Sequence, residues 1–319
     1  MILKKLSGRP GLILLLFCIL IFLPGTIFTQ DQSGAIERGD FRFNYDKNGI
    51  SSLANPNDPF GAAIMPASGK GGPPTLGINI RYRTVSSEEW SQLDVRESFE
   101  AAPKSGTVTY SHSSGRHPLH VKEVYRTDGD VFDWTITLSA AGNRAVQVGD
   151  LSINVPAAGP YGRTPVQIFE HGFLSHSFIS GDGSFIYWVR TSSAPPFLLL
   201  TAQPGTKLEY TRGGGRGGLS AFVHSQVSGG SIKEGTWRQD HTSLRLEPGE
   251  SKTYAFRFQF AESYEELRSL IYENGLFDIR VVPGMTVPRD LEARFSLHTK
   301  AKIEAILSEF PDETTITSL

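Results

Sequence analysis

Apolar and polar side chains alternate over short stretches through most of the chain, from residue 41 to residue 261. The alternation is clearest in residues 76–82, 132–138 and 254–260. A period of two, with β-branched and aromatic residues at the apolar positions, predicts half-buried β-strands. Further strands are expected at 106–112, 119–126, 146–155, 185–190, 197–202, 207–211, 219–225 and 243–247.

Residues 197–200 are apolar at every position, which predicts a central strand buried on both faces. Clusters of Gly, Pro, Asn and Asp separate the strands and are typical of turns. Many short strands with no helix between them predict a mainly β protein built as an antiparallel β-sandwich. About 230 residues is long for an immunoglobulin-type sandwich, so we expect two broad sheets, a supersandwich.

The pattern changes at Glu262. Ser263 and Glu266 have the spacing of a capping box, and apolar residues then recur at helical spacing until Gly275. A second helix is expected over 288–310, followed by Pro311. Its apolar positions are Leu291, Phe295, Ile303, Ile306, Leu307 and Phe310. Such apolar stripes need a cover, which either the sandwich or a missing domain would provide.

Residues 1–30 have the layout of a secretory signal, with Lys4, Lys5 and Arg9 before an apolar run at 11–23. The run has 13 residues, whereas a membrane span needs about 20. We therefore expect a cleaved signal, a secreted or periplasmic protein, and no membrane attachment after cleavage. A retained signal anchor is the alternative. The predicted organisation is a signal peptide at 1–30, a β-sandwich at 31–261 and a helical linker or tail at 262–319.

Charge and cysteine content exclude several classes of function. The full chain has 31 Lys and Arg against 33 Asp and Glu, and the signal carries three of the cations and no acid. The mature chain is therefore acidic, with a net charge of about −5, which argues against nucleic-acid binding. Cys18, the single cysteine, lies in the signal. The mature chain thus has no disulfide, no thiol nucleophile and no cysteine-bound metal.

Several motifs together resemble one family. They are residues 50–59 (ISSLANPNDP), 169–172 (FEHG), 176–190 (HSFISGDGSFIYWVR), 204–210 (PGTKLEY), 246–250 (LEPGE), 264–267 (YEEL) and 281–285 (VVPGM). The chain resembles the N-terminal portion of long secreted bacterial proteins that are similar to glycoside hydrolases. The resemblance covers nearly the whole mature chain. It implies a galactose-mutarotase-like supersandwich and a helical linker, followed in the family by an α/α barrel. The catalytic carboxylates of such enzymes belong to the barrel and have no positions in this sequence.

Glu170, His171 and His176 form the most reactive-looking cluster, and Asp240 is a further candidate for it. Such residues could carry acid/base chemistry on a sugar, as in mutarotases, whose architecture the chain resembles. They could also bind zinc, although the spacing of the two histidines is not a standard one. The alternative is that they form structural hydrogen bonds at strand ends.

Trp90 and Trp237 lie in polar surroundings, unlike Trp134 and Trp188, which fall in apolar strands. Because sugars stack on exposed aromatic faces, Trp90 and Trp237 are the candidate substrate-binding residues. Asn55–Asp58 and the Asp128-Gly-Asp130 turn offer oxygen ligands for a structural calcium ion, or are surface turns. No other cofactor and no metal in the candidate site is expected.

These observations favour an exported, non-catalytic β-sandwich that supports carbohydrate binding or processing by an adjoining helical domain or a partner chain. One alternative is a stand-alone carbohydrate-binding or adhesion module. The other is a small sugar-active enzyme, similar to a mutarotase or a lyase, that uses the His171 and His176 region. Exposure of the apolar positions in 288–310 would favour a missing partner.

Overall fold

The computed structural model describes residues 33–66, 75–93, 96–112, 118–213, 218–232, 239–282, 284, 288 and 290–317. The chain consists of two units, Met1–Gln32 and Ser33–Leu319, and the fold below is that of the second. The predicted secretory signal lies outside the described residues. Among the residues described, no helix combines the length and the apolar character needed to cross a membrane.

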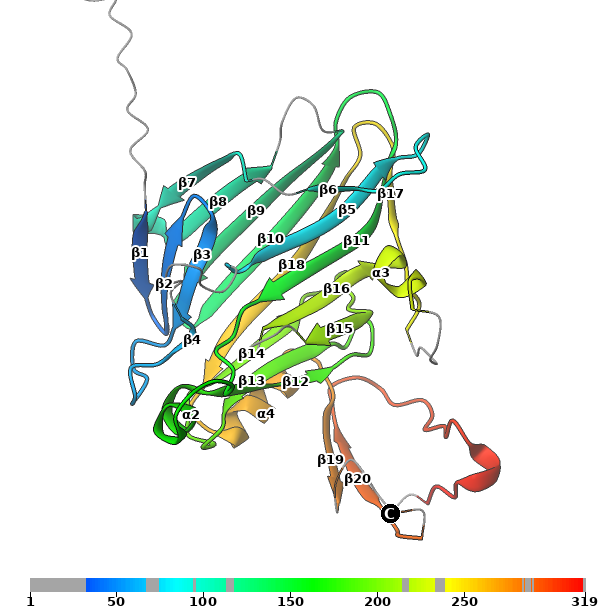
Figure 1. Ribbon diagram of the computed structural model, residues 1–319. Helices are drawn as coiled ribbons and strands as arrows, with labels where there is room; N and C mark the ends of the chain where they lie inside the picture. Colours follow the sequence, from blue (N-terminus) through cyan, green and yellow to red (C-terminus); the bar gives the residue numbers. More distant parts are fainter. Residues whose placement is uncertain are drawn as a thin grey trace, which may run out of the picture. The chain divides into compact units, whose positions relative to one another are not determined.

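Within the described residues, the largest layer is an eight-stranded antiparallel sheet in the order β12-β13-β14-β18-β10-β9-β8-β7 (Figure 1). Its strands are β7 (Ser98–Ala102), β8 (Thr107–His112), β9 (Leu119–Asp128), β10 (Val131–Ala140), β12 (Phe173–Phe178), β13 (Phe185–Arg190), β14 (Phe197–Ala202) and β18 (Ser251–Ala261). In the centre, β10 and β18 place Phe132 opposite Phe258 and Trp134 opposite Phe256. Directly opposed aromatic side chains stabilise strand pairing and fix its register.

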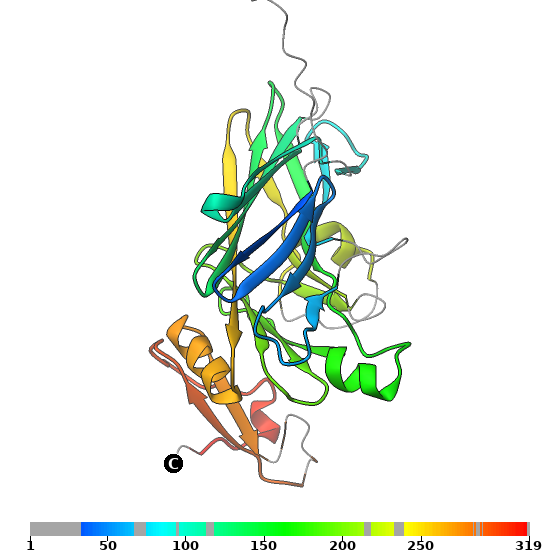
Figure 2. The same ribbon diagram turned by 90° about the vertical axis from the view of Figure 1, so that its left-hand side faces the viewer.

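The second layer of the described chain is a six-stranded sheet in the order β15-β16-β11-β5-β6, with β17 also paired to β11. Its strands are β5 (Gly77–Thr84), β6 (Ser91–Leu93), β11 (Val146–Val155), β15 (Tyr210–Gly213), β16 (Leu219–Ser225) and β17 (Leu244–Leu246). A smaller sheet of β1 (Gly34–Arg38), β2 (Phe41–Asp46), β3 (Gly49–Ala54) and β4 (Ala63–Met65) lies beside them, as Figures 1 and 2 show.

The inward-facing residues of all three sheets pack into one hydrophobic core. The expected mainly β antiparallel sandwich is therefore confirmed. The expected strands also agree closely with the observed ones, except that the strand expected at 207–211 is β15 at Tyr210–Gly213. The prediction for 197–200 is confirmed, because β14 is buried at every position. Leu198 and Leu200 contribute to the main core, whereas Phe197 and Leu199 face a second cluster on the other side of the sheet.

This second cluster lies under helix α4 (Tyr264–Glu273), which covers part of the outer face of the eight-stranded sheet. The Ser263 side chain accepts a hydrogen bond from the Glu266 N–H at 3.0 Å, so the predicted N-cap is confirmed. The Glu266 carboxylate accepts the N–H of Glu262 at 2.8 Å. Gly275 follows with a φ of +76°, the left-handed conformation that ends helices.

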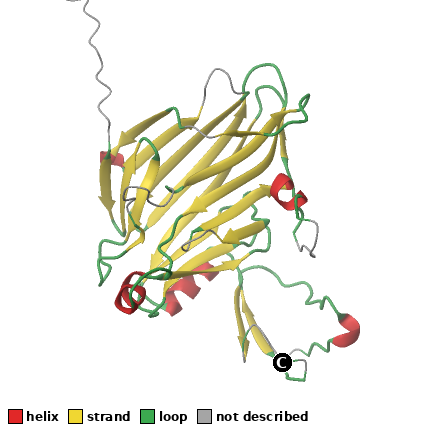
Figure 3. Cartoon of the chain, viewed as in Figure 1, coloured by secondary structure: helices red, strands yellow, loops and turns green. Residues whose placement is uncertain are grey.

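The prediction of a second helix over 288–310 is wrong for the described residues. After α4 the chain forms a hairpin of β19 (Asp278–Val282) and β20 (Arg294–His298), and residues 299–310 contain no helix (Figure 3). Pairing with β19 fixes the alternation of β20, and this overrides the helical spacing of the apolar residues. Whether this segment leads into a further α/α domain stays a prediction.

Short helices also interrupt the strands, contrary to the expectation of none. They are α2 (Pro165–His171), α3 (Gln226–Gly230) and the single-turn η1 (Pro103–Ser105), and a further turn, η3 (Pro311–Glu313), lies near the C-terminus. The sequence signal for α2 was a capping box: Thr164 accepts the Gln167 N–H, and the Gln167 side chain accepts the Thr164 N–H.

Candidate functional site

Glu170 and His171 lie on α2, where no residue is buried. The His171 Nε2 atom is 3.5 Å from a Glu170 carboxylate oxygen, and both side chains are about one-third exposed. The backbone carbonyl of Glu170 accepts a hydrogen bond from the guanidinium of Arg190, which is fully buried. The Glu170–His171 pair therefore lies on the solvent-exposed side of α2, and the hydrogen bond from the buried Arg190 holds this helix to the sandwich.

The other predicted site residues lie elsewhere. His176 is on the edge strand β12, and Asp240 is in the exposed segment before β17. No interaction joins Glu170 or His171 to His176 or Asp240 among the described residues, and no group of three metal-ligating side chains forms there. The proposed acid/base role of these four residues stays a prediction.

Trp90 is half-buried on the outer side of the six-stranded sheet, and Trp237 lies outside the described residues. The Arg83 guanidinium sits 4.5 Å from the centre of the Trp90 ring. The ring also approaches Gly149 so closely that a Cβ there would overlap it. Trp90 is therefore built into the sheet surface and does not stand free, and its role in sugar binding stays a prediction.

A concave site, called here the outer groove, lies beside α4 on the outer face of the eight-stranded sheet. It has a volume of about 600 Å³. Its lining comes from β12 and β13 (Ser175, His176, Ser177, Phe178, Phe185, Tyr187), from α4 (Tyr264, Leu267, Arg268, Ile271) and from the segment through β19 (Phe277, Asp278, Ile279, Arg280, Val281, Gly284). A volume of this size and a mixed lining are typical of small-molecule sites.

Cross-strand ring pairs form the floor of the outer groove. His176 is opposite Tyr187 in the register of β12 and β13, and the two rings stack at 4.9 Å. Phe178 and Phe185, the next pair along, stack at 5.2 Å. In the described part of the chain β12 is the last strand of the sheet, so no neighbouring strand there covers the second face of the His176 ring.

Polar groups stand beside these rings. The Tyr187 and Tyr264 hydroxyls are 3.2 Å apart, and burial, together with this hydrogen bond, raises the pKa of Tyr187. Arg268 forms a two-pronged ion pair with Asp278, with one N–O distance of 2.9 Å. Partial desolvation of the exposed His176 ring lowers its pKa, so the ring is neutral near pH 7. The groove therefore offers neutral donors and acceptors, one internally balanced charge pair and the exposed cation Arg280.

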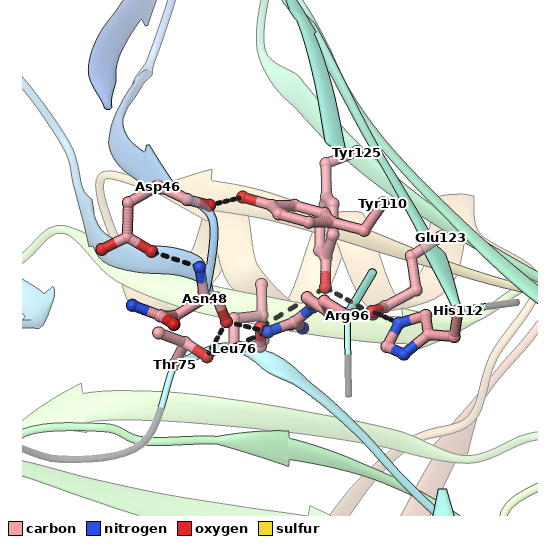
Figure 4. Close-up of polar contacts among 9 residues, drawn as sticks. All are labelled: Asp46, Asn48, Thr75, Leu76, Arg96, Tyr110, His112, Glu123 and Tyr125. Atoms are coloured by element: carbon pink, nitrogen blue, oxygen red, sulfur yellow. Dashed lines mark hydrogen bonds and ion pairs between the residues drawn. The ribbon is translucent and has the colours of Figure 1, made fainter. Parts of the chain in front are cut away.

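A second polar group, the Arg96 cluster, consists of Arg96, Tyr110, His112, Glu123 and Tyr125 and lies inside the sandwich (Figure 4). Glu123 accepts hydrogen bonds from Arg96 Nε at 3.1 Å and from the Tyr125 hydroxyl at 2.7 Å, and it contacts His112 Nε2 at 2.8 Å. Burial alone would raise the pKa of Glu123, but the Arg96 charge and these hydrogen bonds hold it below its ordinary value.

Arg96 also binds three other segments of the chain. Its guanidinium donates to the carbonyls of Asn48 and Leu76 and to the Thr75 hydroxyl, and it lies over the Tyr110 ring. A Cβ atom at Gly49 or Gly77 would overlap its terminal nitrogens. Arg96 stands between β6 and β7, where the chain crosses from the six-stranded to the eight-stranded sheet. The Arg96 cluster thus holds the segment that joins β6 to β7 against the small sheet and against β5.

Sequence reasoning missed the Arg96 cluster, although one signal was present. Along β9 the inward positions are Leu119, Val121, Glu123, Tyr125 and Thr127, so a glutamate occurs in phase with core residues. On β8, His112 is likewise in phase with Val108 and Tyr110. An ionisable residue at an inward strand position requires a buried partner.

A third group, the His224 cluster, joins β16 and β18 to the segment that precedes β17. His224 Nε2 is 2.6 Å from the Tyr254 hydroxyl, and its Nδ1 is 2.7 Å from the Thr242 hydroxyl. Thr242 in turn donates to Glu209, so the histidine donates from Nδ1 and accepts at Nε2. Burial, together with the charge of Lys252, lowers the pKa of His224 to about 4.

Ser225 completes the His224 cluster. Its hydroxyl donates to Glu209 at 2.7 Å and lies 2.7 Å from His241 Nδ1. The serine is fully buried and its proton goes to the carboxylate, so this arrangement is not that of a serine nucleophile with its base. The cluster anchors the segment at 239–243 to the sheet.

The two candidate calcium turns are occupied by other contacts. Asp58 forms an ion pair with the buried Arg190, and its other oxygen accepts the N–H groups of Phe60 and Ala62 at 2.9 and 3.0 Å. Asp128 forms ion pairs with Arg126 at 3.1 Å and with Arg38 at 3.7 Å. These contacts favour the alternative of structural and surface turns.

Comparison with solved structures supports the fold. A polysaccharide lyase is similar with a TM-score of 0.59 and 14% identity over 77% of this chain and 36% of its own chain. A putative aldose 1-epimerase of Escherichia coli K12 matches with a TM-score of 0.44 and 9% identity over 72% and 99%. A GH36 α-galactosidase of Geobacillus stearothermophilus matches with 0.44 and 10% over 79% and 43%.

At these identities the likeness concerns the fold alone, and it is the lyase that supports it. The chain spans about a third of the lyase and less than half of the galactosidase. Comparison with curated proteins gives no match. A comparison with protein-family profiles matches residues 69–318, and by this match the chain belongs to DUF5695, a family of unknown function.

Proposed function

We propose that this chain is an exported, non-catalytic β-sandwich of a glycoside-hydrolase-like protein. It would support carbohydrate binding or processing by an adjoining helical domain or a partner chain that docks on its C-terminal segment. The likeness of the fold to a polysaccharide lyase is consistent with a carbohydrate role. In the described part of the chain, the buried ionisable groups of the Arg96 and His224 clusters are engaged in structural contacts, which supports a non-catalytic role.

The observation that carries the docking proposal is the exposure of apolar side chains after α4. Of the sixteen large apolar side chains that are exposed among the described residues, nine lie in residues 279–316. All six positions expected to form an apolar stripe in 288–310 are among them. Exposed apolar surface of this density is typical of an interaction site. A two-stranded hairpin such as β19–β20 needs packing against another element for stability, and α4 supplies part of it through the Arg268–Asp278 ion pair and the stacked rings of Tyr272 and His298.

Binding of a hydrophobic dye to the mature chain tests the docking surface. We expect strong dye fluorescence, and we expect the double variant Leu307→Ser/Phe310→Ser to reduce it by at least half. The control is Val166→Ser/Phe169→Ser on α2, which removes two apolar side chains that are also more than half exposed but lie outside the segment. Equal dye binding by all three proteins would contradict the proposal.

Export and the absence of catalysis need separate tests. We expect a bacterial host to release the protein to the periplasm or medium with its first thirty or so residues removed, as N-terminal sequencing would reveal. A protein that keeps residues 1–30 would contradict export. Polysaccharide turnover by the mature chain that is lost in Glu170→Gln, His171→Ala or His176→Ala would contradict the non-catalytic role and favour the alternative of a small sugar-active enzyme.

A further inference from the structure

We propose that the outer groove binds a short uncharged oligosaccharide, so that this chain has a saccharide site of its own. The inference rests on the proposed carbohydrate role and adds to it the place, the ligand class and the residues. It concerns the face of the eight-stranded sheet beside α4, which lies opposite the main core.

The outer groove combines aromatic and polar side chains. A sugar ring has apolar C–H patches and a rim of hydroxyl groups, so its site needs rings and neutral hydrogen-bonding groups side by side. The stacked pairs His176–Tyr187 and Phe178–Phe185 supply the rings. The exposed His176 ring has one face free of strand contacts, because β12 is the edge of the sheet.

The polar groups at the rings of the outer groove are hydroxyls and a neutral imidazole. The hydroxyls of Tyr187 and Tyr264 meet at the groove, and Tyr264 is 48% exposed, so it can donate to or accept from a bound hydroxyl. The neutral imidazole of His176 can do both. The ring pairs of the floor carry no charge at neutral pH, and the Arg268 charge beside them is balanced by Asp278. This favours an uncharged saccharide over an acidic one, although Arg280 stands exposed at the rim.

Strand pairing and helix packing hold the β13 and α4 parts of the groove lining in place. Pairing with β14 and the second core under α4 hold β13 in place, and the Ser263 cap fixes the start of α4 next to Tyr264. Side chains on paired strands and a packed helix keep their positions without a ligand, which lowers the entropic cost of binding. The α2 residues Glu170 and His171 do not line this groove.

Isothermal titration calorimetry of the mature chain tests the proposal. The probes are cellotetraose, maltotetraose, mannotetraose and xylotetraose, with tetragalacturonate as the acidic comparison. We expect saturable binding of at least one neutral tetrasaccharide, a loss of affinity of at least tenfold in Tyr264→Ala and in His176→Ala, and a change of less than twofold in Tyr161→Ala. Tyr161 is a matched control because it is 73% exposed and lies outside the groove.

Each outcome has a distinct meaning. Tighter binding of tetragalacturonate than of every neutral probe would overturn the ligand class. Saccharide binding that survives both Tyr264→Ala and His176→Ala would overturn the site and leave the proposed carbohydrate role intact. Absence of any saccharide binding would overturn the inferred site, whereas the proposed support of an adjoining domain would stand or fall with the dye-binding experiment. Both altered residues are exposed, and circular dichroism of each variant verifies that it keeps the fold. Tyr264→Phe, which keeps the ring, should lose less affinity than Tyr264→Ala.

Discussion

The Arg96 cluster and the outer groove contain similar residue types and have opposite surroundings. Both combine arginine, histidine, a carboxylate and tyrosines. Glu123 is fully buried and both of its oxygens bind the chain, whereas His176 and Tyr264 in the groove face solvent. The contrast teaches that reactive residue types do not mark a site by themselves. A buried cluster whose polar atoms bind the chain itself stabilises the fold, whereas a cluster whose polar atoms face solvent can bind a ligand.

The largest expected effect is on the Arg96 cluster. Glu123→Gln removes the carboxylate charge that balances Arg96, whose side chain is only 12% exposed. An uncompensated buried charge costs about 3–5 kcal/mol, so we expect a loss of that size in the free energy of unfolding measured with urea. Asp133→Asn is the control, because its pair with Arg257 is 35% exposed on each side and should cost less than about 1 kcal/mol. Equal losses of unfolding free energy in Glu123→Gln and Asp133→Asn would contradict the structural role assigned to the buried cluster.

The next effect is a dependence of stability on pH. The pKa of His224 is about 4 in the folded chain, which is below the ordinary value of a histidine. As pH falls, His224 is therefore protonated in the unfolded chain before it is protonated in the folded chain. The free energy of unfolding should therefore fall between about pH 6.5 and pH 4, by up to about 3 kcal/mol from this group. His224→Gln should flatten that part of a urea titration series. Glu123 contributes to the free energy of unfolding in a lower pH range. Because its pKa is lowered in the folded chain, this contribution is lost as pH falls through and below the usual carboxylate range.

A smaller loss is expected when the space around Arg96 is filled. Gly77→Ala would place a Cβ atom against a terminal nitrogen of Arg96, and overpacking of this kind costs about 1–3 kcal/mol. Gly230→Ala is the control, since among the described residues no atom beyond its chain neighbours and its own helix lies within 4 Å of a Cβ at that position. Thermal unfolding of the two variants compares them directly. A melting temperature in Gly77→Ala equal to that of Gly230→Ala would mean that Arg96 is not held in a tight slot.

The smallest stability effect is expected in the groove. Tyr264→Phe removes the hydrogen bond to Tyr187 at an exposed position, so it should cost less than about 1 kcal/mol. It should also lower the pKa of Tyr187, because the Tyr264 hydroxyl contributes to raising it. Ultraviolet absorbance during an alkaline titration measures this change. An unchanged titration would show that the two hydroxyls do not interact in solution.

The sequence predicted the sandwich because its signals are local. Period-two alternation around Phe256 and Phe258 identifies a strand without knowledge of its partner. The edge strand β12 was missed because four of its six residues are exposed, so no alternation marks it. The helix expected at 288–310 was wrong because Leu291 and Phe295 fit helical spacing, while pairing with β19 decides the structure of Arg294–His298.

The candidate site was harder to predict, because its contacts join distant positions. His176 was selected from the sequence and does line the groove, but Tyr264, which lines it too, is contributed by a helix that the sequence did not link to His176. Glu123 and Arg96 are 27 residues apart, and only the fold brings them together. The exposure of Leu307 and Phe310 likewise depends on tertiary structure, which residue type does not reveal.

Hydrogen–deuterium exchange of the mature chain with and without the tightest-binding neutral tetrasaccharide tests the central contrast most directly. The account predicts that the saccharide slows exchange in β12, β13 and α4, and that β8 and β9, which carry the Arg96 cluster, exchange slowly and equally in both conditions. Protection confined to β8 and β9, or to the six-stranded sheet around Trp90, would contradict the account. It would place the saccharide in the region assigned here a structural role.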